Sequence, residues 1–404
     1  MAAQEPLDRS GPPPGPPARP PMWNDPVYRA LFFQALVLLG VIAVGVFLVN
    51  NTLNNLERQG IASGFGFLDR TAGFSIGETH FGVQYQEEDT YARTFWVGLA
   101  NTIWISAWGI ALATILGFTV GVLRLSTNWL VSRLAMVYIE LLRNIPLLLQ
   151  IFFWYFAVLR PLPAPRNSVE LFDSFFLNNR GLAYPEGIPE EGFGFVIAAF
   201  VIAVVLSVVL VRWAGKRQDA TGERFPAWWA SLGLVVGLPL LVFVALGAPL
   251  HWETPKLQGF NFRGGVVMSP EFVALLMALS LYTAAFIAEI VRAGIMAVSH
   301  GQTEASLALG LRPAQTLRLV IVPQAMRVII PPLTSQYLNL TKNSSLAAAI
   351  AYPDIVLVFA GTALMQTGQA VEIIAITMAV YLTLSLLISA FMNWYNQSMA
   401  LVER

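Results

Sequence analysis

The chain of 404 residues contains no cysteine, and this absence removes several kinds of chemistry at once. Without thiols it can form neither disulfides nor thiolate metal sites, and it has no cysteine nucleophile. Histidine is scarce too: His80, His251 and His300 are the only ones, and none lies in a His-Glu-x-x-His pattern. We therefore predict neither a catalytic residue nor a metal ligand in this chain.

Charge is also in short supply, because 12% of the residues are charged whereas about 25% is usual. The 24 basic and 24 acidic residues cancel, so no net charge attracts nucleic acid. The only lysines are Lys216, Lys256 and Lys342, and none lies in the glycine-rich pattern of an ATP-binding P-loop. We predict that this chain itself binds no cofactor and no ATP by that route.

Long hydrophobic runs take the place of charge, with 56% hydrophobic residues and a mean hydropathy of +0.62. Runs of about 20 apolar residues are long enough to cross a bilayer. The predicted spans are Ala30–Val49, Trp96–Leu123, Val131–Leu159, Phe193–Val211, Ala227–Leu246, Phe272–Ala297, Val328–Ile350 and Ile373–Met392. The sequence thus predicts an all-α polytopic membrane protein with about eight transmembrane helices. Ile355–Met365 is too short to cross and is expected to be interfacial or re-entrant.

The N-terminal part is predicted to be a tail followed by a membrane anchor. Residues 1–29 are predicted to be a disordered, proline-rich cytoplasmic tail, since residues 11–21 read GPPPGPPARPP. Residues 30–49 could be a signal peptide, but the run is long and no Ala-x-Ala cleavage site follows it. We therefore interpret residues 30–94 as a retained transmembrane anchor followed by a periplasmic loop.

The basic residues set the predicted orientation. Arginine and lysine gather in the short connections 124–133 and 212–224, whereas the loop 50–94 contains an acidic cluster. Because basic loops remain in the cytoplasm, both chain termini are predicted to be cytoplasmic. The external stretches 50–94 and 160–192 are expected to be plain connecting loops, with an ordered lid or a docking surface as the alternative.

Polar and charged side chains stand within three of the predicted spans, where a charge costs roughly 2.5–3.5 kcal/mol. A proline at position 146 of the third span is expected to kink the helix and to free backbone carbonyl groups. The candidate substrate-binding residues in these spans are Glu140, Arg143, Asn144, Tyr282, Glu289, Lys342, Asn343 and Ser345. The first three share one helical face, at i, i+3 and i+4.

Two interpretations of these charges stay open. They could be internal ion pairs, Glu140 with Arg143 and Glu289 with Arg292. Alternatively, they could receive a solute that carries both charges, such as a free amino acid. Arg143 and Lys342 would then bind the carboxylate, whereas Glu140, Glu289 and the carbonyls freed by the proline would bind the ammonium group.

Ser299–Val322, between the sixth and seventh spans, forms a predicted cytoplasmic segment. Thr303 is expected to cap a short helix over Glu304–Leu309, which Gly310 would end. Pro313 then suits the first turn of a second helix. Together they predict a compact helical hairpin.

The motifs of this segment resemble the EAA loop of ABC-transporter permease subunits. The chain reads Glu304-Ala305-Ser306, then Gly310, and later Val320-Ile321-Val322-Pro323, where the family has EAA, Gly and I-x-L-P. The residues Gly301-Gln302, Glu140-x-x-Arg143-Asn144 and Lys342-Asn343-Ser344-Ser345 are similar to the polar amino-acid permeases. Within that branch the chain resembles the general L-amino-acid permeases and those for glutamate, glutamine, aspartate and asparagine.

The resemblance implies a five-helix type I ABC importer core plus extra helices. The permease domain would cover residues 95–396, with an insertion at 160–268 that holds external loops and two extra spans. The EAA loop would cover residues 299–323 and couple to a separate ATPase subunit. The residues implied for coupling are Gln302, Glu304, Ala305, Ser306, Gly310 and Pro313.

The same resemblance implies partners and a location. A homologous second permease subunit, two ATPase subunits carrying ATP-Mg and a periplasmic amino-acid-binding protein would assemble with this chain in the bilayer of the bacterial inner membrane. The chain itself would be a permease and not an enzyme. The alternatives are an ion-gradient-driven secondary transporter, which predicts inverted repeats that we do not find, and a membrane enzyme, for which catalytic residues are lacking.

Overall fold

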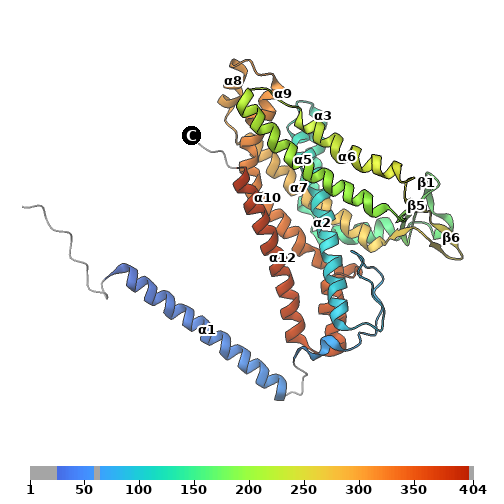
Figure 1. The fold of residues 1–404 in the computed structure, drawn as a ribbon. Coiled ribbons are helices and arrows are strands. Elements are labelled where there is room, and N and C mark those ends of the chain that lie inside the picture. Colours follow the sequence, from blue (N-terminus) through green and yellow to red (C-terminus); the bar gives the residue numbers. More distant parts are fainter. Residues whose placement is uncertain (1–24, 59–63, 400–404) are drawn as a thin grey trace, which may run out of the picture. The chain divides into compact units, whose positions relative to one another are not determined.

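The computed structural model describes residues 25–58 and 64–399, which fall into two compact units. The first contains α1 (Pro26–Arg58) and the segment Gln366–Glu372 (Figure 1). Its stretch Val27–Thr52 is strongly apolar and not buried, as expected for a helix in lipid. The helix extends beyond its predicted bounds, into the segments expected to be the tail 1–29 and the loop 50–94. It begins early because an Asp25 Oδ1 atom accepts a hydrogen bond from the amide of Val27 at 2.9 Å. Residues 1–24 of the predicted tail lie outside the described residues.

The second unit, Leu68–Met365 with Ile373 onwards, is a bundle of long apolar helices. Its long helices are α2 (Tyr91–Arg124), α3 (Trp129–Asn144), α5 (Phe193–Thr221), α6 (Ala227–Ala245), α7 (Pro270–Met296), α10 (Val322–Asn343) and α12 (Ala370–Ser398). In the described part of the chain seven helices are long and apolar enough to cross a membrane, or eight with one bent pair counted as a span. The prediction of a mostly helical polytopic protein with about eight spans is confirmed.

α7 is the centre of this bundle, since it packs against both α2 and α10. Glycines allow the close approach of α2. A Cβ atom on Gly117 would lie 2.6 Å from the Cβ of Ile287, and one on Gly121 would lie 2.7 Å from the carbonyl oxygen of Ala288. Helices in lipid associate through such small residues, because no hydrophobic effect drives them together.

The third predicted span is broken rather than kinked. α3 ends at Asn144, and α4 (Leu147–Phe152) continues into η2 (Phe153–Leu159) at an angle of 106° to it. Pro146 stands between them in an extended conformation, with a ψ of 135°. A proline inside a helix removes one backbone hydrogen bond and clashes with the preceding turn, and here the helix stops altogether.

The insertion between α4 and α7 contains eight short strands beside α5 and α6. The strands are β1 (Val169–Leu171), β2 (Phe175–Asn178), β3 (Gly181–Tyr184), β4 (Glu186–Pro189), β5 (Leu250–Glu253), β6 (Lys256–Gln258), β7 (Asn261–Arg263) and β8 (Val266–Met268). They form an antiparallel sheet in the order β1-β2-β3-β8 and the pairs β4-β5 and β6-β7. The expectation of a plain loop over residues 160–192 is therefore wrong.

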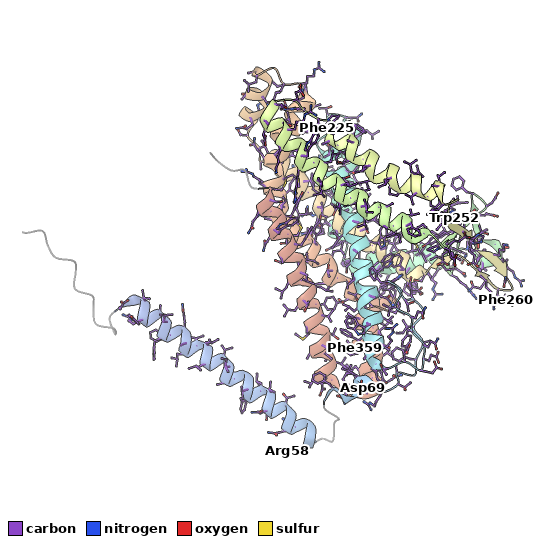
Figure 2. All side chains as sticks on the ribbon, in the orientation of Figure 1. Arg58, Asp69, Phe225, Trp252, Phe260 and Phe359 are labelled. Atoms are coloured by element: carbon purple, nitrogen blue, oxygen red, sulfur yellow. The ribbon has the colours of Figure 1, made fainter. Side chains whose placement is uncertain are left out.

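Two features explain why this insertion is ordered. Gly181 has a φ of +118°, and a Cβ atom there would overlap the carbonyl oxygen of Met268, so only glycine lets β3 pair with β8. The rings of Phe176 and Phe262 stack with centroids 4.6 Å apart. Trp252 and Phe260 stand exposed near the tips of the strands (Figure 2).

The remaining helical elements are short. They are η1 (Phe65–Asp69), η3 (Pro165–Asn167), α8 (His300–Ala308), α9 (Pro313–Thr316), η4 (Leu317–Ile321), η5 (Ser344–Ile350), η6 (Val356–Ala363) and α11 (Leu364–Thr367). The run over 356–367 is a short apolar helix. Its interfacial or re-entrant placement stays a prediction.

Candidate functional site

The EAA segment, residues 299–323, stands at one end of the bundle as the short helices α8 and α9 (Figure 1). α8 begins directly after Ser299, whose carbonyl accepts a hydrogen bond from the amide of Gln302 at 3.0 Å. The predicted cap at Thr303 is therefore wrong, because that residue already lies inside the helix. The earlier start adds almost a full turn to the hairpin.

The turn between α8 and α9 has the predicted glycine and proline. Gly310 has a φ of +79°, which side-chain-bearing residues rarely adopt, and its amide bonds to the carbonyl of Leu307 at 2.9 Å. Pro313 occupies the first turn of α9. The side chain of Gln315 accepts a hydrogen bond from the amide of Arg312 at 2.9 Å and fixes this start. The predictions for Gly310 and Pro313 as helix boundaries are confirmed.

Ser306 lies inside the hairpin, with 4% of its surface exposed. Its hydroxyl donates to the carbonyl of Thr303 at 2.8 Å and lies 3.0 Å from the hydroxyl of Thr316, to which it is also hydrogen-bonded. Thr316 is buried as well. Ser306 therefore joins α8 to α9 and presents nothing to a partner.

The outer face of the hairpin carries the other predicted coupling residues. Exposed there are Gln302, Glu304, Ala305, Gly310 and Pro313. A Glu304 Oε1 atom lies 3.1 Å from Nδ1 of His300, and both side chains are open to solvent. Leu309, at the tip, is 82% exposed.

Two of the predicted substrate residues, Arg143 and Tyr282, lie on either side of Phe286, where α3 packs against α7. The Arg143 guanidinium lies over the ring of Phe286, 5.1 Å from its centroid, and Phe286 in turn contacts Tyr282. Tyr138 fixes this contact, because its hydroxyl donates to the carbonyl of Leu281 at 2.8 Å. Within the described chain no carboxylate pairs with Arg143, so the Glu140–Arg143 ion pair is not formed. Its guanidinium can accept an external carboxylate.

Gln150 fills the break in the third span. Its Nε2 atom donates to the carbonyls of Leu142 and Ile145, each at 2.9 Å, and the side chain is buried. These two carbonyls thus already accept a hydrogen bond from an amide of the chain itself, and the expectation that carbonyls freed by Pro146 would bind a substrate ammonium stays a prediction. A glutamine four residues after a proline within an apolar run was the available signal.

The two acidic candidates, Glu289 and Glu140, differ in their hydrogen bonds and ion pairs. Both carboxylate oxygens of Glu289 bond to the guanidinium of Arg292, so this residue is in an internal ion pair. Glu140 is exposed, and its carboxylate has a single hydrogen bond in the described chain, a long one of 3.5 Å from Asn144. The amide of Asn144 also donates to the backbone carbonyl of Glu140 at 2.7 Å. Glu140 is therefore the acid available to a ligand.

The remaining candidates lie at the end of α10. The Lys342 side chain is exposed and has no ion pair with any residue of the ranges 25–58 and 64–399. Ser345 donates to the carbonyl of Lys342 at 2.7 Å, and Asn343 is half-buried. In those ranges no hydrogen bond or ring contact joins this group to Arg143. The site assignments of both groups stay predictions.

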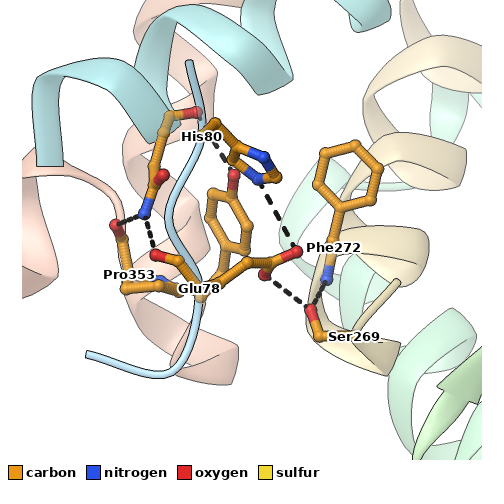
Figure 3. A network of polar contacts seen from close by, with 7 residues as sticks. Glu78, His80, Ser269, Phe272 and Pro353 are labelled. Carbon is orange, nitrogen blue, oxygen red and sulfur yellow. Dashed lines mark hydrogen bonds and ion pairs between the residues drawn. The ribbon is translucent and has the colours of Figure 1, made fainter. Parts of the chain in front are cut away.

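A polar network that the sequence did not reveal lies at the other end of α7 (Figure 3). The Ser269 hydroxyl donates to a carboxylate oxygen of Glu78 at 2.8 Å. The side-chain amide of Asn101 donates to the carbonyls of Glu78 and Pro353, at 2.9 and 2.8 Å. The network joins the loop before α2 to α2 itself, to the start of α7 and to the turn after η5. Only a glutamate and a histidine close together in a glycine-rich loop hinted at it.

Burial changes the protonation of this network. Desolvation raises the pKa of Glu78 to about 7, against the lowering effect of the Ser269 hydrogen bond. Desolvation lowers the pKa of His80, whose ring stacks on that of Trp104 at 4.9 Å. His80 Nε2 lies 3.6 Å from a Glu78 oxygen. This contact is an ion pair only when His80 is protonated and Glu78 is ionised at the same time, and burial disfavours both charges.

The described residues contain no group of three or more histidines or acids that could hold a metal ion. The helical bundle carries an exposed hairpin at one end, as the resemblance to transporter permeases predicts. The comparisons agree. Residues 109–401 match the family model of binding-protein-dependent transport system inner membrane components. The chain belongs to this family and is a multi-pass membrane protein.

Curated relatives match along almost the whole chain. It is 57% identical to the putative amino-acid ABC transporter permease protein YhdX of Escherichia coli K12, over 94% of this chain and 96% of the relative. It is 54% identical to the general L-amino acid transport system permease protein AapQ of Rhizobium johnstonii, over 94% of each. It is 43% identical to the glutamate/glutamine/aspartate/asparagine transport system permease protein BztB of Rhodobacter capsulatus, over 94% of this chain and 96% of the relative.

Proposed function

We propose that the chain is the permease subunit of an ATP-driven, binding-protein-dependent importer of L-amino acids. The relatives named as amino-acid permeases support the cargo, and the family supports dependence on a binding protein. The exposed face of the EAA segment is the observation that carries the coupling role. No observation supports an ion-gradient-driven transporter.

The EAA segment would dock on a separate ATPase subunit that binds ATP-Mg. With this segment in the cytoplasm, as the positive-inside rule predicts, the Glu78 end of α7 faces the periplasm. A homologous second permease subunit, two ATPase subunits and a periplasmic amino-acid-binding protein would complete the transporter. Both termini would be cytoplasmic.

The hairpin is rigid and would transmit movement of the ATPases to the membrane helices. Because the Ser306–Thr316 contact holds α8 to α9, a push on the exposed face reaches α7 and α10 together. The membrane helices would then alternate between states open to either side. Glu304 and Leu309 are exposed on the hairpin and would receive that push.

Within the membrane, the cargo would meet Arg143 and Glu140. The guanidinium can bind the carboxylate of an amino acid with two parallel hydrogen bonds, and Glu140 can accept from the ammonium group. Glu289 is already paired with Arg292, so it would stabilise α7 and not bind the cargo. Lys342 would be a second cation along the path.

Reconstitution of the purified complex in liposomes tests this function. We expect uptake of L-amino acids that requires both ATP and the binding protein. A Glu304→Lys variant should lose about tenfold in uptake while assembling normally, since a reversed charge in a contact surface costs on the order of 1–2 kcal/mol or more. Asp219→Lys, at an exposed position in the last turn of α5, is the matched control and should transport normally. Full uptake by Glu304→Lys, or uptake without any ATPase, would refute the proposal.

A further inference from the structure

A cavity of about 470 Å³ lies at the periplasmic end of the bundle, beside the Glu78 network. Its walls come from the loop before α2, the end of η2, the turn between β2 and β3, the start of α7 and the turn after η5. The polar residues that line it include Glu78, Arg160, Asn179, Arg180, Ser269 and Glu271. The volume is in the range typical of sites for small molecules.

The charges of this cavity are not paired with one another. In the described chain neither Arg160 nor Arg180 lies within ion-pair distance of a carboxylate. Tyr155 separates the two kinds of charge: its ring lies under Arg160, with the guanidinium carbon 5.1 Å from the centroid, while its hydroxyl donates to Glu271 at 2.6 Å. Glu78 is held by Ser269. Arg160, Glu271 and Glu78 are thus held in place without being neutralised by an opposite charge of the cavity.

An unpartnered acceptor adds to this arrangement. The side-chain oxygen of Asn179 is buried and has no hydrogen-bond donor in the described chain. A buried acceptor without a donor is costly, and a ligand that donates to it removes that cost. The cavity therefore offers two guanidinium groups for a carboxylate, and two carboxyl groups with an amide oxygen for an ammonium group. Leu357 and Val358 supply apolar wall beside them.

We propose that this cavity is a receiving site for a free amino acid on the periplasmic side of the transporter, separate from the intramembrane residues Arg143 and Glu140. The proposal rests on the import function proposed above. Cargo released by the binding protein would bind here by both its charges before it enters the membrane. The presence of both basic and acidic groups argues against other ligands. A lone anion would meet the two acids, and a metal cation would meet the two arginines.

The walls of the site connect it to the bundle. Asn101 of α2 bonds to both Glu78 and Pro353, each of which belongs to a segment that lines the cavity. Binding of a ligand in the cavity would therefore affect the outer ends of α2 and α7. These ends have to move when the bundle opens to the periplasm.

Binding of radiolabelled L-glutamine to the complete transporter in nanodiscs, without binding protein, tests the site. We expect Arg180→Gln and Glu271→Gln each to raise the dissociation constant about tenfold or more, because each removes one charge-assisted contact. Glutaramate, which lacks the α-amino group, and L-glutaminamide, which lacks the α-carboxylate, should compete poorly. Arg166→Gln is the matched control: Arg166 belongs to the same insertion but lies over Phe260, away from the cavity lining.

Three outcomes would overturn the site. The wild-type complex could fail to bind free glutamine, or both variants could bind it as the wild type does. In a third outcome the variants would weaken attachment of the binding protein while leaving binding of free glutamine intact, and the cavity would then receive a side chain of that protein. ATP-dependent uptake by the wild-type complex, measured in parallel, keeps a failure of the site distinct from a failure of the proposed function.

Discussion

The hydroxyl groups of Ser306 and Thr316 lie 3.0 Å apart, and both side chains are buried between α8 and α9. We expect Ser306→Ala to transport within about twofold of the wild type, since alanine fits the space and one hydrogen bond is worth about 1 kcal/mol. Ser306→Leu should lower uptake about tenfold, because the larger side chain forces the helices apart. ATP-driven uptake in proteoliposomes measures both. Normal uptake by Ser306→Leu would show that the hairpin need not be rigid.

At Gly310 the backbone conformation, and not the space around the residue, decides the effect of a substitution. Its φ is +79°, yet an added Cβ atom would have no neighbour within 4 Å. We therefore expect Gly310→Asn to retain most activity, because asparagine tolerates the left-handed region, and Gly310→Val to lose about tenfold. Uptake and ATP hydrolysis by the assembled complex distinguish them. Equal activity of the two variants would mean that the left-handed turn is dispensable.

Gln150 is expected to be essential for the break in the third span. Gln150→Leu leaves the carbonyls of Leu142 and Ile145 without their donor, at a cost of about 1–3 kcal/mol for each buried group. The variant should unfold at a lower temperature in detergent. Gln84→Leu, in the exposed loop before α2, serves as the control and should match the wild type. An unchanged unfolding temperature for Gln150→Leu would contradict the assigned role.

Arg143 is expected to serve the cargo and not the fold. It is exposed, and its one described contact is with the ring of Phe286. Arg143→Ala should therefore lower uptake about tenfold with normal assembly. Arg143→Lys should be intermediate, because lysine keeps the charge and loses the planar fork. Arg133→Ala, on the same helix, is the control. Unchanged apparent affinity and rate in Arg143→Ala would remove this residue from the site.

Local signals in the sequence predicted the parts of the fold that depend on neighbours along the chain. Apolar run length placed the spans, and Gly310 and Pro313 marked the boundaries of the hairpin, because both act through their own backbone conformation. Pro146 marked a disruption in the same way. The angle of 106° between the two halves of the broken span could not be predicted, since it results from the packing of the whole bundle and not from one residue.

The contacts that the sequence did not predict join distant residues. Leu182 of β3 pairs with Met268 of β8 across two intervening helices, and strands of three or four residues are too short for a period of two to show. Glu78 and Ser269 are 191 residues apart. For the candidate substrate site, the sequence selected the charged residues but could not tell that Glu289 is already paired.

The stability of the network around Glu78 should depend on pH. Burial raises its pKa from 4.5 to about 7, so the folded state binds more protons than the unfolded state between these values. Stability therefore falls as pH rises from about 4.5 through about 7, by about 3 kcal/mol in total, and then levels off. His80 opposes this slope over part of the range, since its lowered pKa makes the unfolded state the better proton acceptor there.

A comparison with Glu78→Gln isolates the contribution of Glu78, because the neutral amide can still accept the hydrogen bond from Ser269. We expect this variant to unfold at a higher temperature than the wild type near pH 8 and at a similar one near about pH 4. Thermal unfolding of the purified complex in detergent across that range measures the difference, and Glu88→Gln, in the same loop, is the exposed control. Parallel curves for wild type and Glu78→Gln would show that Glu78 carries no raised pKa, and the carboxyl would then be charged in the folded protein at neutral pH.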